Sequence, residues 1–313
     1  GVPLARLREA AHGLIGGPPA WRDRHAPLLL ESPQQLHALG LIPARDAASY
    51  RFETLDGRTV ELRLVAEPPA ADRPVADTER LLLPDVIPPR TGDVDSGWRG
   101  LLAADAAPWA LREPSRAFRW RHLPELDAMV VEMRQTVPAR DHTLKDFYAE
   151  VGDALQRHAP KHLVLDLRLN GGGDLTQARD FAESLPTRVP GRLFVLTSPW
   201  TFSAAISVTG YVKQAAPSRV TIVGEEAGDR LEFFAEGRVV TLPHSGEVLL
   251  PATERHDFRD GCRRFDDCPA PLVKRPIAIA TLMPELPAPW TIEAYRRGED
   301  PAMAAVAAAL QAR

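Results

Sequence analysis

Lysine is scarce in this chain. The 38 basic residues include only four lysines, Lys145, Lys161, Lys213 and Lys274. The formal net charge is −4, so the positive excess that nucleic-acid and anionic-membrane binding require is absent, and we expect no nucleic-acid partner. Apolar runs of 18 residues are absent as well, and we expect no membrane span.

Cysteine occurs only twice, as Cys262 and Cys268, in a polar and irregular segment. No nearby histidine or third cysteine completes a four-ligand zinc pattern, so we expect no metal site here. A short-loop disulfide is favoured over two unrelated thiols, because free thiols in such a segment would be exposed. A disulfide indicates an oxidising compartment, and we expect a periplasmic or secreted protein whose signal peptide is not in this chain.

Proline, in contrast, is abundant, with 30 of 313 residues. It gathers at 66–75 and 83–90, which we interpret as extended linkers, because proline fixes φ and lacks an N–H donor. Before these stretches, apolar residues at helical spacing predict helices within 1–45, and alternation around a central Asp-Gly pair predicts a β-hairpin over 50–65.

The pattern changes near residue 115. Strands are predicted at 118–123, 128–135, 162–169, 193–197 and 220–223, with helices at 144–158, 175–185 and 203–216. Such alternation produces right-handed crossovers and a parallel sheet. Shorter antiparallel strands are expected at 231–235, 238–242 and 247–250, and an alanine-rich helix at 301–312. We therefore expect an α/β core domain over 113–313, preceded by an N-terminal helical and hairpin segment over 1–112.

Two segments are predicted to meet at the carboxyl edge of this sheet, where open α/β folds place their sites. One is Asn170 followed by three glycines, whose bare backbone amides suit an anion or an oxyanion. The other ends at Ser203, which opens a helix. On local evidence alone, a structural glycine turn, a nucleotide site and a serine that merely caps its helix all remain open.

A nucleophilic role for Ser203 is supported by its place at a helix N-terminus, where negative charge is stabilised. Its neighbours, Ala204 and Ala205, are small enough to let a substrate carbonyl approach. The amide of Ala204 and one from Gly172 could form the pair of oxyanion donors that acyl transfer requires.

Four segments in order carry a family resemblance: LDLRLNGGG at 165–173, LFVLT with TFSAA at 193–205, IVGE at 222–225 and GEDP at 298–301. Over about 115–313 they resemble the S41 serine peptidases, the C-terminal processing or tail-specific proteases. The resemblance implies a ClpP/crotonase-like catalytic core with Ser203 as nucleophile and Ala204 and Gly172 as oxyanion donors. The N-terminal helices and hairpin resemble the closing part of a PDZ-like domain, a partial remnant.

The general base is harder to assign. Processing proteases of the family use a lysine in a stretch that here reads GEEAGDR at 224–230 and contains none. Lys213 is about 15 Å along the nucleophile helix and Lys161 about 26 Å away along its strand. Lys145 is expected to be solvated, and nothing recommends Lys274.

A histidine is the alternative, as in the tricorn-like branch of the family, where it comes from an earlier domain and here would lie upstream. Within the chain the best local pair is His256 with Asp257, since a carboxylate can orient an imidazole, although a polar loop is the simpler interpretation. His142 and His244 are expected beside a helix start and a strand end. Asp166 and Arg168 are expected to form a structural ion pair near the glycine turn.

The leading hypothesis is a peptidase that forms an acyl-enzyme on Ser203 and uses neither metal nor cofactor. Its partner is a peptide or protein substrate, bound by strand addition. A non-catalytic relative that binds peptides or acts as a scaffold is the second hypothesis, and a nucleotide-binding α/β protein is the third.

Overall fold

The computed structural model describes residues 1–54, 56–66, 102–103, 105–113, 115–140, 142–246, 248–263 and 266–312. The proline-rich stretch at 67–90 lies outside these residues. Of the described residues, 1–66 belong to one compact unit and those from 102 onward to another.

The first unit contains the predicted helices and hairpin. Its helices are α1 (Leu4–His12), α2 (Pro19–Leu30) and α3 (Pro33–Ala38). Ser32 begins α3 by accepting a hydrogen bond from the Gln35 amide at 3.3 Å. The strands β1 (Ala47–Glu53) and β2 (Thr59–Val65) pair antiparallel. The helical and hairpin predictions for this segment are confirmed.

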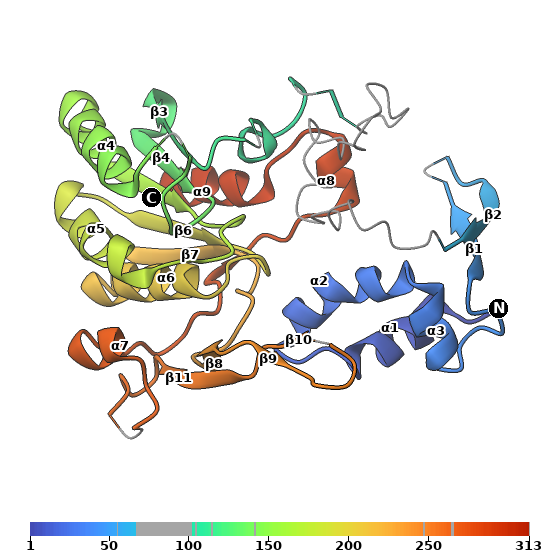
Figure 1. The fold of residues 1–313 in the computed structure, drawn as a ribbon. Coiled ribbons are helices and arrows are strands. Elements are labelled where there is room, and N and C mark those ends of the chain that lie inside the picture. Colours follow the sequence, from blue (N-terminus) through green and yellow to red (C-terminus); the bar gives the residue numbers. More distant parts are fainter. Residues whose placement is uncertain are drawn as a thin grey trace. The chain divides into compact units, whose positions relative to one another are not determined.

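The second unit is built on a six-stranded sheet in the order β12-β7-β6-β5-β4-β3. Figure 1 labels β3, β4, β6 and β7 of this sheet. Its strands are β3 (Phe118–Leu123), β4 (Ala128–Met133), β5 (His162–Asp166), β6 (Leu193–Thr197), β7 (Val220–Gly224) and β12 (Leu286–Pro287). Only β3 is antiparallel to its neighbour; β4 to β7 and β12 are parallel. The predicted mixed α/β fold with a mostly parallel sheet is confirmed.

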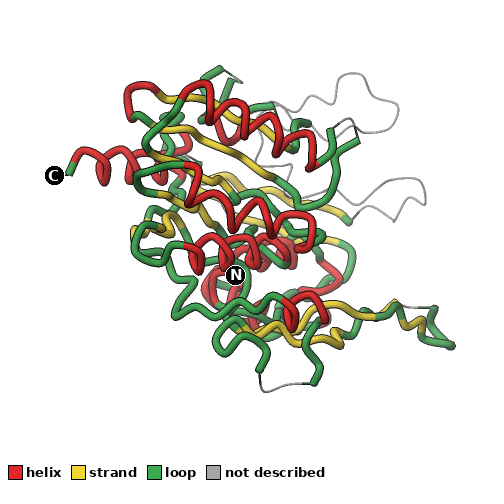
Figure 2. The backbone as a smooth tube through the Cα atoms, turned by 90° about the vertical axis from the view of Figure 1, so that its left-hand side faces the viewer, coloured by secondary structure: helices red, strands yellow, loops and turns green. Residues whose placement is uncertain are grey.

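Helices cover both faces of this sheet. The helices α4 (Leu144–His158), α5 (Leu175–Arg188) and α6 (Ala204–Ala215) lie on one face, which Figure 2 views with the helices in front of the strands. The helix α9 (Pro301–Gln311) lies on the other (Figure 1). Strand side chains alternate between the layers, so Leu163 and Leu165 pack toward α4–α6 while Val164 packs with Val306 of α9. Burial on both faces explains the nearly continuous apolar strands.

Two strands end earlier than predicted. β5 stops at Asp166 instead of 169, because the Asp166 carboxylate accepts the Arg168 amide at 3.1 Å and turns the chain. Leu167 is fully buried all the same. β4 stops at Met133 instead of 135. An apolar side chain buried in a turn has the same sequence signature as one in a strand.

Antiparallel strands follow β7. β8 (Glu232–Gly237) pairs with β11 (Ala252–Asp257), and β9 (Val240–Thr241) pairs with β10 (Val248–Leu249). The strand β11 was not predicted, because its sequence is polar and follows a proline. The short helices α7 (Ala270–Lys274) and α8 (Ile292–Arg296) complete the unit together with 3-10 turns at Trp109–Leu111 and Pro124–Leu126.

Candidate active site

The carboxyl ends of β5 and β6 lead into two loops that are hydrogen-bonded to each other. Thr201 Oγ1 donates to the Leu167 carbonyl at 2.9 Å, and Ser198 Oγ donates to the Arg168 carbonyl at 2.5 Å. The Phe202 amide donates to the Asn170 carbonyl at 3.1 Å. These bonds hold the glycine turn directly against the segment that ends in Ser203.

Ser203 stands immediately before α6 in a strained conformation, with φ 51° and ψ −124°. Positive φ is costly for a residue with a β-carbon, and sharp strand-to-helix turns of this kind present serine nucleophiles in hydrolases. The side chain makes no capping bond to the helix, and it is partly exposed. Within the described chain the hydroxyl has no hydrogen-bond partner. The hydroxyl oxygen of an ordinary N-cap serine would accept a hydrogen bond from an amide in the first turn of the helix.

Gly172 and Ala204 lie beside this serine. A β-carbon on Gly172, whose φ is +110°, would come within 2.7 Å of the Ser203 Cβ and 3.1 Å of the Ala204 nitrogen. Among the residues that the structure describes, the Ala204 amide has no acceptor. The structure therefore brings together three of the four predicted site residues, whereas the fourth, His256, lies in strand β11.

Asn170 was predicted only to open the glycine turn, yet its side chain accepts a hydrogen bond from the Gly172 amide. Its Oδ1 accepts that amide at 2.9 Å and the Thr136 hydroxyl at 3.3 Å. Asn170 is fully buried, and its Nδ2 has no partner in the described part of the chain. Asparagine is typical of such side-chain turns, and this was the signal available. For the Gly172 amide to donate to an oxyanion, its hydrogen bond to Asn170 Oδ1 must break.

Arg168, two residues before Asn170, anchors the glycine turn through two carboxylates. Its guanidinium binds Asp166 (Nε–Oδ1 3.0 Å, Nη2–Oδ2 2.7 Å) and Asp300 (Nη1–Oδ1 2.8 Å, Nη2–Oδ2 2.9 Å). Although burial acts to raise it, the charge of Arg168 holds the pKa of Asp300 below its usual value. Asp300 also caps α9 through the Met303 amide at 3.1 Å. The expected Asp166–Arg168 ion pair is confirmed, and Asp300 extends it to the last helix.

A second buried acid lies next to Asp166 across the sheet. Glu132 is 2% exposed and binds Arg119 at 2.5 Å, with the Arg134 Nε at 3.3 Å. Burial raises the pKa of Glu132 to about 7, against the opposing charge of Arg134. Glu132, Asp166 and their arginine partners form a polar layer near the carboxyl ends of β4 and β5, on the face of the sheet that α9 covers.

The lysines offer no visible base. Lys213 binds the Val220 carbonyl at 2.6 Å and the Glu285 carboxylate, at the far end of α6. Lys145, Lys161 and Lys274 are exposed. Within the described residues, none of the four lysines is hydrogen-bonded to Ser203.

His256 lies in strand β11 and is 1% exposed, so the prediction that it sits in a polar loop is wrong. Its ring stacks on Phe233 with centroids 4.7 Å apart, and burial lowers its pKa to about 4. Neither ring nitrogen has a hydrogen-bond partner in the described chain, although Glu236 Oε1 lies 3.7 Å from Nε2. Successive strand residues point to opposite faces, which separates this imidazole from its sequence neighbour.

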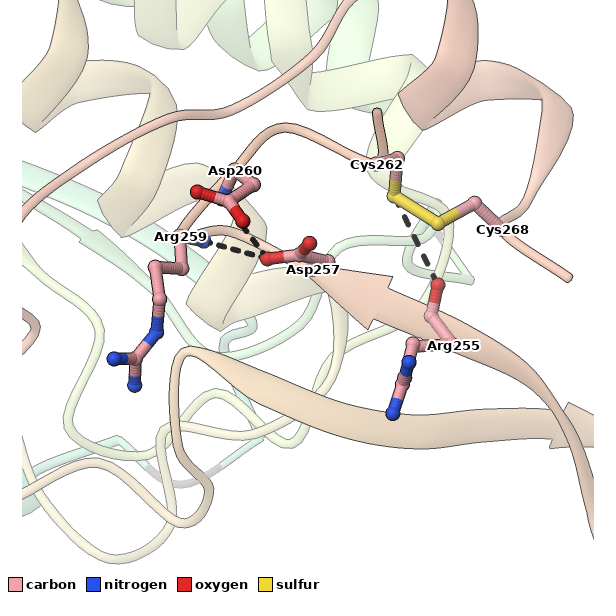
Figure 3. The surroundings of a disulfide bond; sticks show 6 residues. All are labelled: Arg255, Asp257, Arg259, Asp260, Cys262 and Cys268. Carbon is pink, nitrogen blue, oxygen red and sulfur yellow. Dashed lines mark hydrogen bonds between the residues drawn. A yellow bond between two sulfur atoms is a disulfide. The ribbon is translucent and has the colours of Figure 1, made fainter. Parts of the chain in front are cut away.

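Asp257 accepts the amides of Arg259 at 2.9 Å and Asp260 at 3.0 Å (Figure 3). The Asp257 carboxylate therefore closes the turn after β11 and does not orient His256. The predicted Cys262–Cys268 disulfide is formed beside it (Figure 3).

The other predicted histidines are accounted for locally. His142 lies near the start of α4, with Nε2 3.5 Å from Glu150 Oε2 and its ring edge against Phe118 and Phe147. His244 is exposed in the turn between β9 and β10.

The described part of the chain shows neither a phosphate site at the glycine turn nor a cluster of metal ligands. The N-terminus of α5, which follows the glycine turn, is capped by the Asp174 carboxylate through the Thr176 amide at 2.9 Å. An acid at that position disfavours a bound phosphate. The described residues include no group of three or more histidine, cysteine, aspartate or glutamate side chains that could hold a metal. None of the described helices is long and apolar enough to cross a membrane.

No family model and no curated protein matches the chain. Solved structures do resemble it. Mature CPAF complexed with lactacystin has 13% identity and a TM-score of 0.51, over 95% of this chain and 73% of that one. A candidate peptidase from Parabacteroides merdae has 16% identity and a TM-score of 0.42, over 63% and 65%. The photosystem II D1 C-terminal processing protease has 18% identity and a TM-score of 0.33, over 56% of this chain and 47% of that one.

The chain thus spans about half to two thirds of the length of the latter two proteins. Similarity to S41 peptidases is present at the level of structure, with low sequence identity. At such identity, the likeness to CPAF shows the fold alone.

Proposed function

We propose that this chain is an S41-type serine peptidase that cleaves peptide bonds through an acyl-enzyme on Ser203, with a ClpP/crotonase-like core and a PDZ-like remnant before it. The observation that carries the proposal is the state of Ser203. Its backbone is strained, its hydroxyl is unpaired within the described chain, and the unpaired Ala204 amide and the Gly172 α-carbon adjoin it. Strain of this kind is typical of functional residues.

In this mechanism the Ser203 Oγ attacks the carbonyl carbon of the scissile peptide bond. The negative charge that develops on the carbonyl oxygen is stabilised by the Ala204 amide and by the N-terminal end of α6. Gly172 becomes the second donor when its amide leaves Asn170 Oδ1. The proton lost by the Ser203 hydroxyl is transferred to the amine as the carbon–nitrogen bond breaks. Water then hydrolyses the acyl ester, which releases the carboxylic acid and restores the Ser203 hydroxyl.

A non-catalytic peptide-binding protein is the alternative, and two observations favour it. The Gly172 amide already has an acceptor, and within the described residues Ser203 lacks a hydrogen-bonded base. The disulfide supports a periplasmic or secreted location, because such bonds persist in oxidising compartments.

A fluorophosphonate probe, which reacts with activated serines, tests the proposal. We expect the folded full chain to be labelled at Ser203 and Ser203→Ala to be unlabelled with an unchanged circular dichroism spectrum. Ser207, one turn further along α6 and fully buried, provides the matched control: Ser207→Ala keeps the labelling. Equal labelling of wild type and Ser203→Ala would contradict the proposal, as would absence of labelling in a chain that binds peptides.

A further inference from the structure

The loop that follows β7 runs alongside the segment that leads to Ser203. The Glu225 amide donates to the Thr197 carbonyl at 3.0 Å, and the Gly228 amide donates to the Thr201 carbonyl at 2.9 Å. Thr197 Oγ1 also donates to the Glu225 carbonyl at 2.7 Å. The two segments therefore advance in the same direction, in contact at both points.

This register determines which side chains reach the nucleophile. Ser203 lies two residues beyond Thr201, and Asp229 lies one residue beyond Gly228. Ala227, just before, is 1% exposed and packs into the main core, so the loop is fixed at its base. The next ionisable residues along the loop, Asp229 and Arg230, directly follow this last bond to the segment that ends in Ser203.

Of these two, only Asp229 can accept a proton. A guanidinium remains charged at every accessible pH and has no acceptor site. Asp229 is partly buried, and its Oδ1 accepts the amide of the next residue at 2.9 Å. Burial raises the pKa of Asp229, while the Arg230 amide and charge oppose the shift. The other acids of the loop, Glu225 and Glu226, precede the bond to Thr201.

We propose that Asp229 is the proton acceptor for Ser203, acting directly or through one water molecule; this inference rests on the proposed peptidase function. As the Ser203 Oγ forms its bond to the carbonyl carbon, the hydroxyl proton passes to the Asp229 carboxylate. When the carbon–nitrogen bond breaks, the same proton passes to the leaving amine, and Asp229 is again ionised. In deacylation a water molecule attacks the acyl carbon and gives its proton to Asp229, which passes that proton to the Ser203 Oγ as the ester bond breaks.

The assignment uses a group that directly follows the bond between Gly228 and the Thr201 carbonyl, two residues before the nucleophile. The remaining candidates are committed elsewhere: Lys213 to Glu285 at the far end of α6, and His256 to a stack on Phe233. A carboxylate that reaches its donor through water is compatible with the unpaired state of Ser203, because catalytic hydrogen bonds often tighten only when substrate binds.

The rate of fluorophosphonate labelling of the full chain, measured across pH, tests this role. Asp229→Asn keeps the shape of the side chain and removes the base, and we expect it to slow labelling by about 10²–10⁴-fold. Glu226→Gln is the matched control, the same chemical change three residues earlier in the loop, and we expect it to stay within about twofold. The wild-type rate should rise with pH as Asp229 ionises, and this acidic limb should vanish in Asp229→Asn.

The outcomes separate the two claims. Labelling of Asp229→Asn at the wild-type rate, with Ser203→Ala unlabelled, would overturn the role of Asp229 and leave the peptidase function intact. Absence of labelling in the wild type would overturn both. If Asp229→Asn does not fold, Asp229→Glu decides: a displaced acidic limb supports the assignment, and an unmoved limb refutes it.

Discussion

The α-carbon of Gly172 packs against the side chain of Ser203, so closely that a β-carbon on the glycine would lie 2.7 Å from the serine Cβ. The contact joins the turn after β5 to the start of α6. It leaves no room for any other residue at 172, and the positive φ of +110° adds a conformational reason.

Gly172→Ala is therefore expected to destabilise the fold by more than about 1 kcal/mol and to slow serine labelling at least tenfold. Chemical denaturation and probe kinetics measure the two effects. Gly171→Ala is the control, since a β-carbon there meets nothing within 4 Å. Similar losses in the two variants would contradict the contact.

Ser203→Gly should stabilise the protein relative to Ser203→Ala. Glycine adopts φ 51° without the steric cost that a β-carbon carries, and both variants lack the hydroxyl. We expect a difference of about 1 kcal/mol in the free energy of unfolding, with labelling absent in both. Equal stabilities would mean that the backbone at 203 is unstrained.

Arg168→Met should be among the most damaging single changes outside the apolar core. It leaves the carboxylates of Asp166 and Asp300 buried without their cation, which costs about 3–5 kcal/mol. Denaturant midpoints measure the loss. Arg297→Gln breaks an ion pair with Glu299 at the surface and is expected to leave the midpoint unchanged. A loss no larger than that of the control would refute the anchoring role.

His256 should make the protein less stable in acid. Its pKa is about 4 in the folded state and about 6.5 in the unfolded chain, so the unfolded state takes up the proton first as pH falls. The stability that this neutral ring provides is complete above pH 6.5 and disappears between about 6.5 and 4, by about 3 kcal/mol in total. Glu236 is the charged group that faces the ring, from the neighbouring strand.

His256→Phe preserves the stack on Phe233 and should flatten this part of the pH profile, measured by denaturation at intervals of half a pH unit. His244→Phe, at an exposed turn, should leave the profile as it is. An unaltered slope in His256→Phe would show that other groups cause the acid sensitivity.

The sequence was sufficient for the strands β3 to β7 of the central sheet, because apolar periodicity reports burial directly, but it missed the two-residue strand β12. The prediction failed where a buried residue lies outside a strand and where a strand has a polar sequence. Leu167 is buried in a turn, and β11 is a strand with a polar sequence whose identity depends on pairing with β8. Neither property has a local signature.

The candidate site also has one part that the sequence predicts and another that it does not. The meeting of Ser203 with Gly172 could be expected, since neighbouring parallel strands end at one edge. The bond between Asn170 and the Gly172 amide, and the stack that buries His256, depend on rotamers and on tertiary packing. Periodicity contains no information on either.

The ion pair between Arg168 and Asp300 joins residues 132 positions apart. During synthesis from the N-terminus, the strands from β3 to β7 and the helix that follows Ser203 therefore emerge well before the second acid that neutralises Arg168. A nascent chain that stops short of residue 300 contains both Ser203 and the glycine turn, yet the Arg168 guanidinium then has only Asp166 to bind. Asp300, which caps α9, is thus the last of the charged groups around Arg168 to be synthesised.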